Sequence, residues 1–159
     1  MTKYAENTRV SSEQSRNEIE RLVMKYGAGQ FVYGTQEERA VIGFTMVNRQ
    51  VKFFLPLPRR SEFSTYKRGY TTYDRSPSAT ADKYEQAVRQ RWRALALVIK
   101  AKLEAVESGI TEFESEFLAH IVMPNGQTVG EALKPQIESA YQSGKMPPLL
   151  GYDGAADGR

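Results

Sequence analysis

Residues 40–55 read AVIGFTMVNRQVKFFL, and this stretch decides the fold. Large apolar residues occupy every second position in each half of it, which is the two-residue period of a strand with one buried face. Asn48 and Arg49 fit a tight turn between the halves. The stretch therefore predicts a β-hairpin whose buried face is formed by Ile42, Phe44, Met46, Val51, Phe53 and Leu55.

The residues on either side of this hairpin predict a third strand and the end of the sheet. Gln30 to Gly34 is a short aromatic run, and Thr35 to Glu38 is a polar turn that leads into the hairpin. Pro56-Leu57-Pro58 follows it, and proline has no N–H group to donate to a neighbouring strand. We expect a three-stranded antiparallel meander.

Helical periodicity appears before and after the predicted sheet. Ser11 with Gln14 has the pattern of a capping box and opens a helix over about residues 12–26. A long helix follows from roughly Thr80 to Ser108, and Gly109 closes it. Its packing side is predicted to be Tyr84, Ala87, Val88, Leu95, Val98, Ile99 and Leu103, and we expect Trp92 to lie in the core.

Two shorter helices are expected near the carboxyl terminus. Thr111 with Glu114, and Thr128 with Glu131, repeat the capping-box pattern. Pro135 must kink or restart the last helix, because proline cannot donate the intrahelical hydrogen bond. The order of elements predicts an α+β fold: a single domain over residues 11–144, a flexible start over residues 1–10 and an extended tail over residues 145–159.

Composition limits the class of protein. The chain has 159 residues and no cysteine, so disulfides, thiolate metal sites and cysteine nucleophiles are excluded. The first residues lack the apolar core of a signal peptide. The longest mostly apolar stretch, Ala94 to Val106, is interrupted by charges and is too short to cross a bilayer. We expect an intracellular protein with no membrane partner.

Positive charge is concentrated in the middle of the chain. Residues 49–102 contain 13 Lys or Arg against 4 Asp or Glu, a local net charge of +9. The rest of the chain carries 9 positive and 15 negative side chains, a net charge of −6. An excess of this size attracts anionic partners, unless folding scatters the charges over opposite faces.

Aromatic residues are interleaved with these charges. Residues 59–80 show neither helical nor strand period, and we interpret them as a mobile basic loop. Arginine binds phosphate through paired donors, and exposed rings stack on unpaired bases. On the long helix Arg91 lies about 160° round from Arg93, so it is left out of the predicted surface. The candidate nucleic-acid-binding residues are Arg59, Arg60, Tyr66, Lys67, Arg68, Tyr70, Tyr73, Arg75, Arg89, Arg93 and Lys100.

Signatures of catalysis are weak. His120 is the one histidine, on an apolar helix, where such a residue is more often packed than catalytic. No carboxylate set distinguishes itself as a two-metal site, and no Walker or dinucleotide-binding motif occurs. We predict no catalytic residue, no metal and no cofactor; a small nuclease is the minority interpretation.

Several phrases resemble a known family. QRWRALALVIKAKLEAVESGITEFESEFLAHIVMPNGQTVGEALKPQIESAYQSGKMPPLL at residues 90–150 and VKFFLPLPRR at residues 51–60 resemble a family of small bacteriophage and prophage proteins that has no assigned activity. The resemblance implies a phage origin and expression in the cytoplasm of the host bacterium. It implies no catalytic residue.

Two functions remain open at this point. The first is a non-enzymatic nucleic-acid-binding protein that binds or anneals single-stranded DNA in phage replication or recombination. The second is a phage factor whose basic surface binds an acidic host protein and remodels or inhibits a host machine. Self-association is compatible with both, because the exposed edges of a three-stranded sheet favour pairing with another copy.

Overall fold

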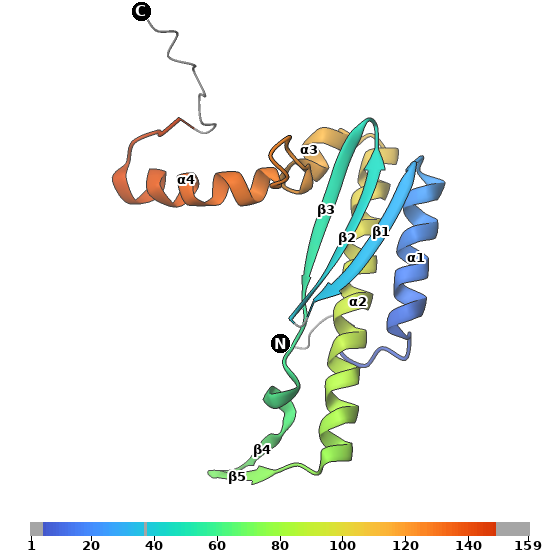
Figure 1. The fold of residues 1–159 in the computed structure, drawn as a ribbon, viewed down its shortest axis with the longest axis vertical. Coiled ribbons are helices and arrows are strands. Elements are labelled where there is room, and N and C mark those ends of the chain that lie inside the picture. Colours follow the sequence, from blue (N-terminus) through green and yellow to red (C-terminus); the bar gives the residue numbers. More distant parts are fainter. Residues whose placement is uncertain (1–4, 37, 149–159) are drawn as a thin grey trace, which may run out of the picture.

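A three-stranded sheet packs against two helices in the computed structural model, which describes residues 5–36 and 38–148 (Figure 1). The antiparallel strands β1 (Gln30–Gln36), β2 (Arg39–Met46) and β3 (Arg49–Pro56) lie in the order β1-β2-β3. The helices α1 (Ser12–Lys25) and α2 (Pro77–Glu107) cover one face of the sheet. The predicted α+β class and antiparallel meander are confirmed.

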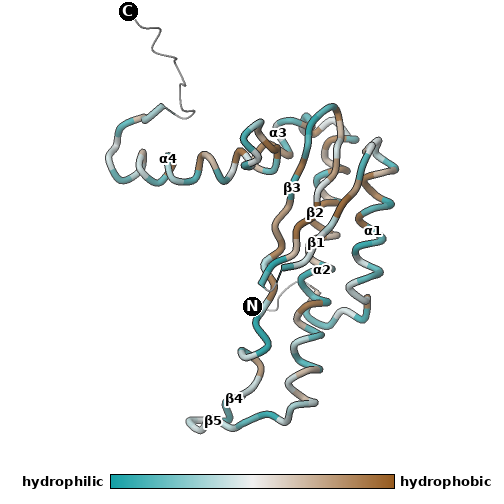
Figure 2. The backbone as a smooth tube through the Cα atoms, viewed as in Figure 1, coloured by the Kyte–Doolittle hydropathy of each residue, from teal (hydrophilic) through white to brown (hydrophobic). Residues whose placement is uncertain are grey.

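The core lies between this face of the sheet and the two helices. All six residues predicted for the buried face of the hairpin are buried, and they pair across the strands, for example Ile42 with Phe53 and Phe44 with Val51. Figure 2 shows the apolar colouring along β2, β3 and the middle of α2. The helices contribute Ile19, Val23, Trp92, Leu95, Ala96, Ile99 and Leu103. Trp92 is a core residue, as predicted.

The turn between β2 and β3 lies one residue earlier than predicted. Val47 and Asn48 form it, with positive φ values of 50° and 56°. Two-residue hairpin turns favour positive φ at both central positions, because that twist matches the strands. Asparagine tolerates this conformation, but a β-branched valine seldom adopts it, so the sequence signal pointed to Asn48 and Arg49.

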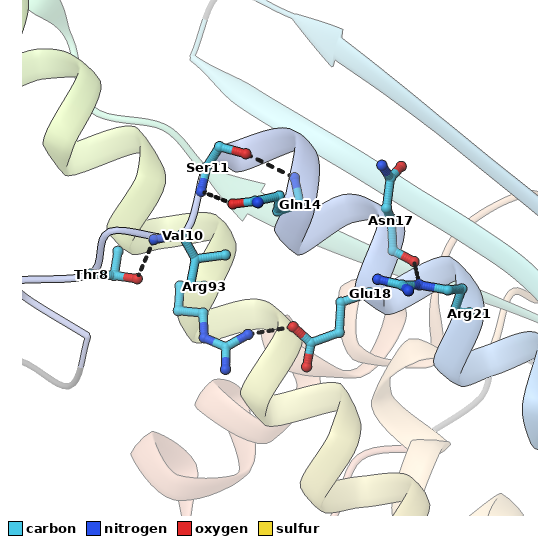
Figure 3. Close-up of polar contacts among 8 residues, drawn as sticks. All are labelled: Thr8, Val10, Ser11, Gln14, Asn17, Glu18, Arg21 and Arg93. Carbon is cyan, nitrogen blue, oxygen red and sulfur yellow. Dashed lines mark hydrogen bonds and ion pairs between the residues drawn. The ribbon is translucent and has the colours of Figure 1, made fainter.

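The capping box predicted for α1 is present. The backbone N–H of Gln14 donates to Ser11 Oγ at 3.0 Å, and the Ser11 N–H donates to Gln14 Oε1 at 3.0 Å (Figure 3). These bonds satisfy amide groups that have no partner inside the first turn. The helix ends at Lys25, one residue before the predicted boundary.

The region between β3 and α2 differs from the prediction. A 3₁₀ turn, η1 (Arg60–Phe63), leads into β4 (Thr65–Arg68) and β5 (Thr71–Asp74), which pair as a second antiparallel sheet. The prediction of no regular structure over residues 59–80 is wrong. Both faces of this hairpin are exposed and polar, so no alternation of apolar and polar residues marked its strands.

Helix α2 begins at Pro77, three residues before the predicted start. Ser76 is the N-cap and its side chain accepts from the Ala79 N–H at 3.2 Å. Proline is favoured at the first helical position, since its fixed φ suits a helix and its missing N–H would have no partner there. The pair Ser76-Pro77 therefore marks the start of α2, whereas the prediction from apolar periodicity placed the start at Thr80.

Beyond α2 the chain forms α3 (Phe113–Phe117), the 3₁₀ turn η2 (Leu118–His120) and α4 (Val129–Ser143). The capping box expected at Thr111 and Glu114 does not form, because α3 starts after Glu112 without a side-chain cap. Phe113, Phe117 and Ile121 are buried, and the chain at Ile121 pairs with Val51 at the edge of the sheet.

Helix α4 extends away from the rest of the molecule (Figure 1). Its predicted capping box is present: Thr128 N–H donates to Glu131 Oε2 at 2.8 Å, and Glu131 N–H donates to Thr128 Oγ1 at 3.1 Å. The helix runs through Pro135 as one element, without the restart that we considered, and Gly144 ends it with a φ of 66°. None of its residues is buried.

The described residues on either side of the predicted domain, 5–10 and 145–148, form neither helix nor strand. Residues 1–4 and 149–159, parts of the predicted flexible start and extended tail, lie outside the described residues. Across residues 5–36 and 38–148, helices with the length and apolar character needed to span a membrane are absent.

Candidate nucleic-acid interface

A hairpin that carries five of the predicted binding residues lies at one end of the molecule (Figure 1). We call β4 and β5, residues 65–74, the basic hairpin. Tyr66 pairs with Tyr73 and Arg68 with Thr71, so these four side chains share one face, while Lys67 lies on the other. Gly69, with a φ of 63°, and Tyr70 form the tip.

Arg75 forms hydrogen bonds to the backbone of residues 63–65 at the base of the hairpin. Its Nη1 donates to the carbonyl oxygens of Phe63 and, at 3.2 Å, Thr65, and its backbone N–H donates to the Ser64 carbonyl at 2.7 Å. The guanidinium carbon also lies 5.4 Å from the centre of the Tyr66 ring. Arg75 was predicted to contact a ligand, but its donors are used to hold the two strands together.

The hairpin is joined to the body through α2. The ring of Phe63 meets the edge of Tyr84 with 6.3 Å between centroids, and η1 packs along the first turns of α2. An isolated two-stranded hairpin is marginally stable, so these contacts are needed to hold it. They position the basic hairpin at the end of the molecule opposite α3 and α4 (Figure 1).

The outer residues of the basic hairpin are available for binding. Tyr70 is fully exposed at the tip. Tyr66 and Tyr73 stack on one another at 5.6 Å and 25°, with 42% and 45% of their surfaces exposed. Within residues 5–36 and 38–148, neither Lys67 nor Arg68 forms an ion pair.

The two arginines that precede the hairpin differ in their surroundings. Arg59 pairs with Glu38 through two contacts, Nε to Oε1 at 2.7 Å and Nη2 to Oε2 at 2.9 Å. The hydrogen bond that Arg59 donates to the Glu38 carboxylate raises the pKa of Arg59. Arg60 is exposed and forms no ion pair with a described residue. Arg59 is therefore partly neutralised, whereas Arg60 adds an available charge near the hairpin.

The predicted line of cations along α2 does not form one available surface. Arg93 pairs with Glu18 of α1, and the side chains are only 24% and 30% exposed (Figure 3). Arg89 donates to Gln86 Oε1 at 2.7 Å and lies 3.8 Å from Glu85. Lys100 is exposed on its own, far along the helix from the hairpin.

Carboxylates outside residues 49–102 neutralise part of the basic segment. Besides the pairs of Arg59 and Arg93, Arg49 contacts Glu114 at 2.7 Å and Lys102 contacts Glu116 at 2.9 Å. The local charge of +9 falls to +5 when these four carboxylates are counted with it. Of the remaining cations, Lys67 and Arg68 lie on the hairpin, which also carries Asp74, and Arg60 lies shortly before it.

His120 occupies a packed position, as predicted. Its ring stacks on Phe53 with 3.9 Å between centroids. Burial lowers the pKa of His120, and the charges of Lys102 and Lys134 lower it further, against a hydrogen bond to the backbone of Lys52 that raises it. In the described part of the chain, no three His, Asp or Glu side chains are grouped so as to hold a metal ion.

One surface feature was missed from the sequence. The face of the sheet that α1 and α2 leave uncovered holds an open groove of about 700 Å³, whose lining includes Val32, Val41, Gly43, Thr45 and Lys52. Gly43 deepens it, because a Cβ there would lie 3.1 Å from a methyl of Val32. A small residue in the middle of a strand was the available signal.

Comparison with known proteins adds no relative. No protein-family model, no curated protein and no solved structure matches this chain.

Proposed function

We propose that the protein binds single-stranded nucleic acid through the basic hairpin. The observation that carries this proposal is the fully exposed Tyr70 at the hairpin tip, next to Lys67 and Arg68, which form no ion pair with any described residue. An exposed large ring costs hydration free energy and lies where it can stack on a base. Cations on both faces of the hairpin can contact the phosphates on either side of that base.

The proposed binding residues are fewer than those predicted from the sequence. Arg60, Lys67 and Arg68 contact phosphates, and Tyr70 stacks on a base. The stacked pair Tyr66 and Tyr73 offers its outer edge and supports the hairpin. Arg59, Arg75, Arg89 and Arg93 serve the fold instead, since at least one guanidinium nitrogen of each already has a protein partner.

The biological setting remains part of the same proposal. A single-strand binder of phage origin would assist replication, or anneal strands in recombination, within the cytoplasm of the host bacterium. Such a role needs binding without a reaction, which agrees with the packed position of His120.

Fluorescence anisotropy with a labelled single-stranded oligonucleotide tests the phosphate contacts. Three contacts give a slope of log affinity against log salt of about −2 for single strands. The double variant Lys67→Ala/Arg68→Ala should reduce the slope to about −0.7, for one remaining contact, and weaken binding tenfold or more. Arg21→Ala/Lys25→Ala removes the same charge from the far part of α1 and should change binding little. Equal losses in both double variants would contradict the proposed site.

A matched pair of tyrosines tests the stacking contact. Tyr70→Ala should weaken binding about tenfold, because base–aromatic stacking contributes about 1–3 kcal/mol. Tyr33→Ala is the control, since Tyr33 is also an exposed tyrosine but lies on β1, outside the hairpin. Unchanged affinity in Tyr70→Ala would remove the aromatic part of the proposal.

An acidic host protein is the competing ligand for the same cations. If the wild-type protein shows no oligonucleotide binding at low salt, the nucleic-acid proposal fails. Capture of a stoichiometric protein from nuclease-treated host lysate, lost in Lys67→Ala/Arg68→Ala, would then assign the hairpin to protein binding.

A further inference from the structure

Helix α4 is less well supported than any other long element of the fold. It has 15 residues and none of them is buried. Helices of about this length are marginal in water on their own, and a proline inside a helix costs about 3 kcal/mol relative to alanine. Capping at Thr128 and Gly144 offsets only part of that cost. A helix with these properties needs a surface to pack against.

Its apolar residues are arranged for such packing. They recur at helical spacing and cover about half of the circumference: Val129, Ala132, Leu133, Ile137, Ala140 and Tyr141. The first turn meets η2, where a Cβ on Gly130 would lie 2.9 Å from the Ala119 carbonyl oxygen. The outer part is open, with Ile137 47% and Tyr141 88% exposed. We call Leu133, Ile137, Ala140 and Tyr141 the α4 stripe.

The charges beside the α4 stripe indicate what covers it. Lys134 and Glu138 border one edge, one turn apart, and their charges are opposite. The other edge carries Ala132, Ser139 and Ser143, which have no charge. In an antiparallel helix pair like edges meet, whereas in a parallel pair each edge meets the opposite one. An antiparallel copy therefore places Lys134 within a turn of the partner's Glu138, twice, and a parallel copy leaves both without a charged partner.

We propose that α4 is the contact surface of a homodimer, in which the α4 stripes of two copies pack antiparallel around a two-fold axis near Ile137. Such an interface is self-complementary, as two-fold contacts require. A single helix pair is smaller than a standard interface, so we expect a dissociation constant on the order of micromolar. The hairpin lies at the opposite end of the molecule, and the proposal does not depend on nucleic-acid binding.

Sedimentation velocity over a series of concentrations tests the dimer. The wild-type protein should pass from monomer to dimer as the concentration rises. Ile137→Lys should raise the dissociation constant at least about tenfold, because the dimer contains the substitution twice. Gln142→Lys places the same charge about 140° round α4 from Ile137, beside Glu138, and should change the constant by less than about threefold. Circular dichroism checks that α4 keeps its helicity in both variants.

A charge exchange between two variants tests the antiparallel arrangement. Lys134→Glu and Glu138→Lys should each weaken their own homodimer several-fold by placing like charges together. Mixed in equal amounts they should form a heterodimer tighter than either homodimer, an effect that a change within one helix cannot produce. Absence of this preference would overturn the antiparallel pairing.

Two results would overturn the dimer itself. One is a monomer at every concentration of the wild-type protein. The other is a dimer that survives Ile137→Lys but is lost on Val32→Lys, which would move the contact to the groove on the open face of the sheet.

Discussion

The basic hairpin and the middle of α2 both carry arginines, but the arginines of the two regions have different surroundings. On α2, Arg93 reaches Glu18 of the neighbouring helix and Arg89 is bonded to Gln86. On the hairpin, Arg68 is exposed and has no ion pair with a described residue. The hairpin projects from the body, whereas α2 lies beside α1, whose carboxylates are within reach (Figures 1 and 3).

The arginines of α2 and of the hairpin therefore have different roles, although the sequence alone does not distinguish them. A cation that packs beside a second element meets that element's carboxylates and contributes to folding. A cation on the projecting hairpin, such as Arg68, forms no ion pair with a described carboxylate and stays available to a ligand. The comparison can be tested by removing one cation at a time and measuring stability and binding separately.

Arg75→Ala is expected to give the largest effect, because Arg75 directly follows the hairpin but its guanidinium has protein partners, like those of the arginines on α2. Losing hydrogen bonds from a charged donor should lower the free energy of opening of the hairpin by about 1.5–3 kcal/mol. Hydrogen exchange of the amides in residues 65–74 measures it. Arg68→Ala is the control, and equal loss of protection in both variants would refute the bracing role.

Arg93→Ala should destabilise the whole fold by about 1–2 kcal/mol. Its pair with Glu18 is partly buried, and therefore lies between the small values of exposed pairs and the large values of buried ones. Urea unfolding measures the change, and a double-mutant cycle with Glu18→Ala isolates the pair. Arg91→Ala, an exposed arginine on the same helix, should stay within about 0.5 kcal/mol of the wild type.

Tyr66→Ala should weaken the hairpin by about 0.5–1 kcal/mol, through loss of its stacking on Tyr73. The ring resonances of Tyr73 in an NMR spectrum should shift, and protection of residues 65–74 should fall. Tyr70→Ala should leave both unchanged, because Tyr70 is fully exposed at the tip. Lost protection in Tyr70→Ala would mean that the tip tyrosine supports the hairpin.

The smallest effect expected is a dependence of stability on pH through His120. Burial, followed by the charge of Lys102, lowers the pKa of His120 in the folded state below its ordinary 6.5. The unfolded chain then takes up the proton more readily, so this contribution to stability is complete above pH 6.5 and falls as the pH drops toward the folded-state pKa. Urea midpoints between about pH 5 and 7 should vary less in His120→Gln than in the wild type. An unaltered pH profile would count against this assignment.

The elements that bury apolar residues were predictable from the sequence. Alternation in residues 40–55 predicted the central hairpin, and the polar caps Ser11 and Thr128 marked two helix starts. These signals are local, because each depends on residues within a turn or a strand of one another. The strands of the basic hairpin were not predicted, because all of their residues are exposed and their sequence therefore lacks an alternation of apolar and polar residues.

The candidate site was only partly predictable. Exposure of Tyr70 and Lys67 followed from their place in a polar segment, and both remain in the proposed surface. Arg59 pairs with Glu38 and Arg93 with Glu18, so neither arginine remains in the proposed binding surface. The sequence did not predict these ion pairs, because the carboxylates lie 21 and 75 residues away along the chain. Helical geometry did place Arg89 and Arg93 together, but could not show that this side faces α1.

Trp92 gives the molecule an internal optical probe. It is the only tryptophan, 1% exposed, on the part of α2 that packs in the core, with the Arg16 guanidinium 5.3 Å from its ring. Its emission therefore reports on the contact between α1, the sheet and α2, and not on the hairpin tip or the α4 stripe. Unfolding of the core can be followed by fluorescence in the presence of an oligonucleotide or of a second copy. A change in tryptophan emission when either of them binds would mean that the core itself rearranges.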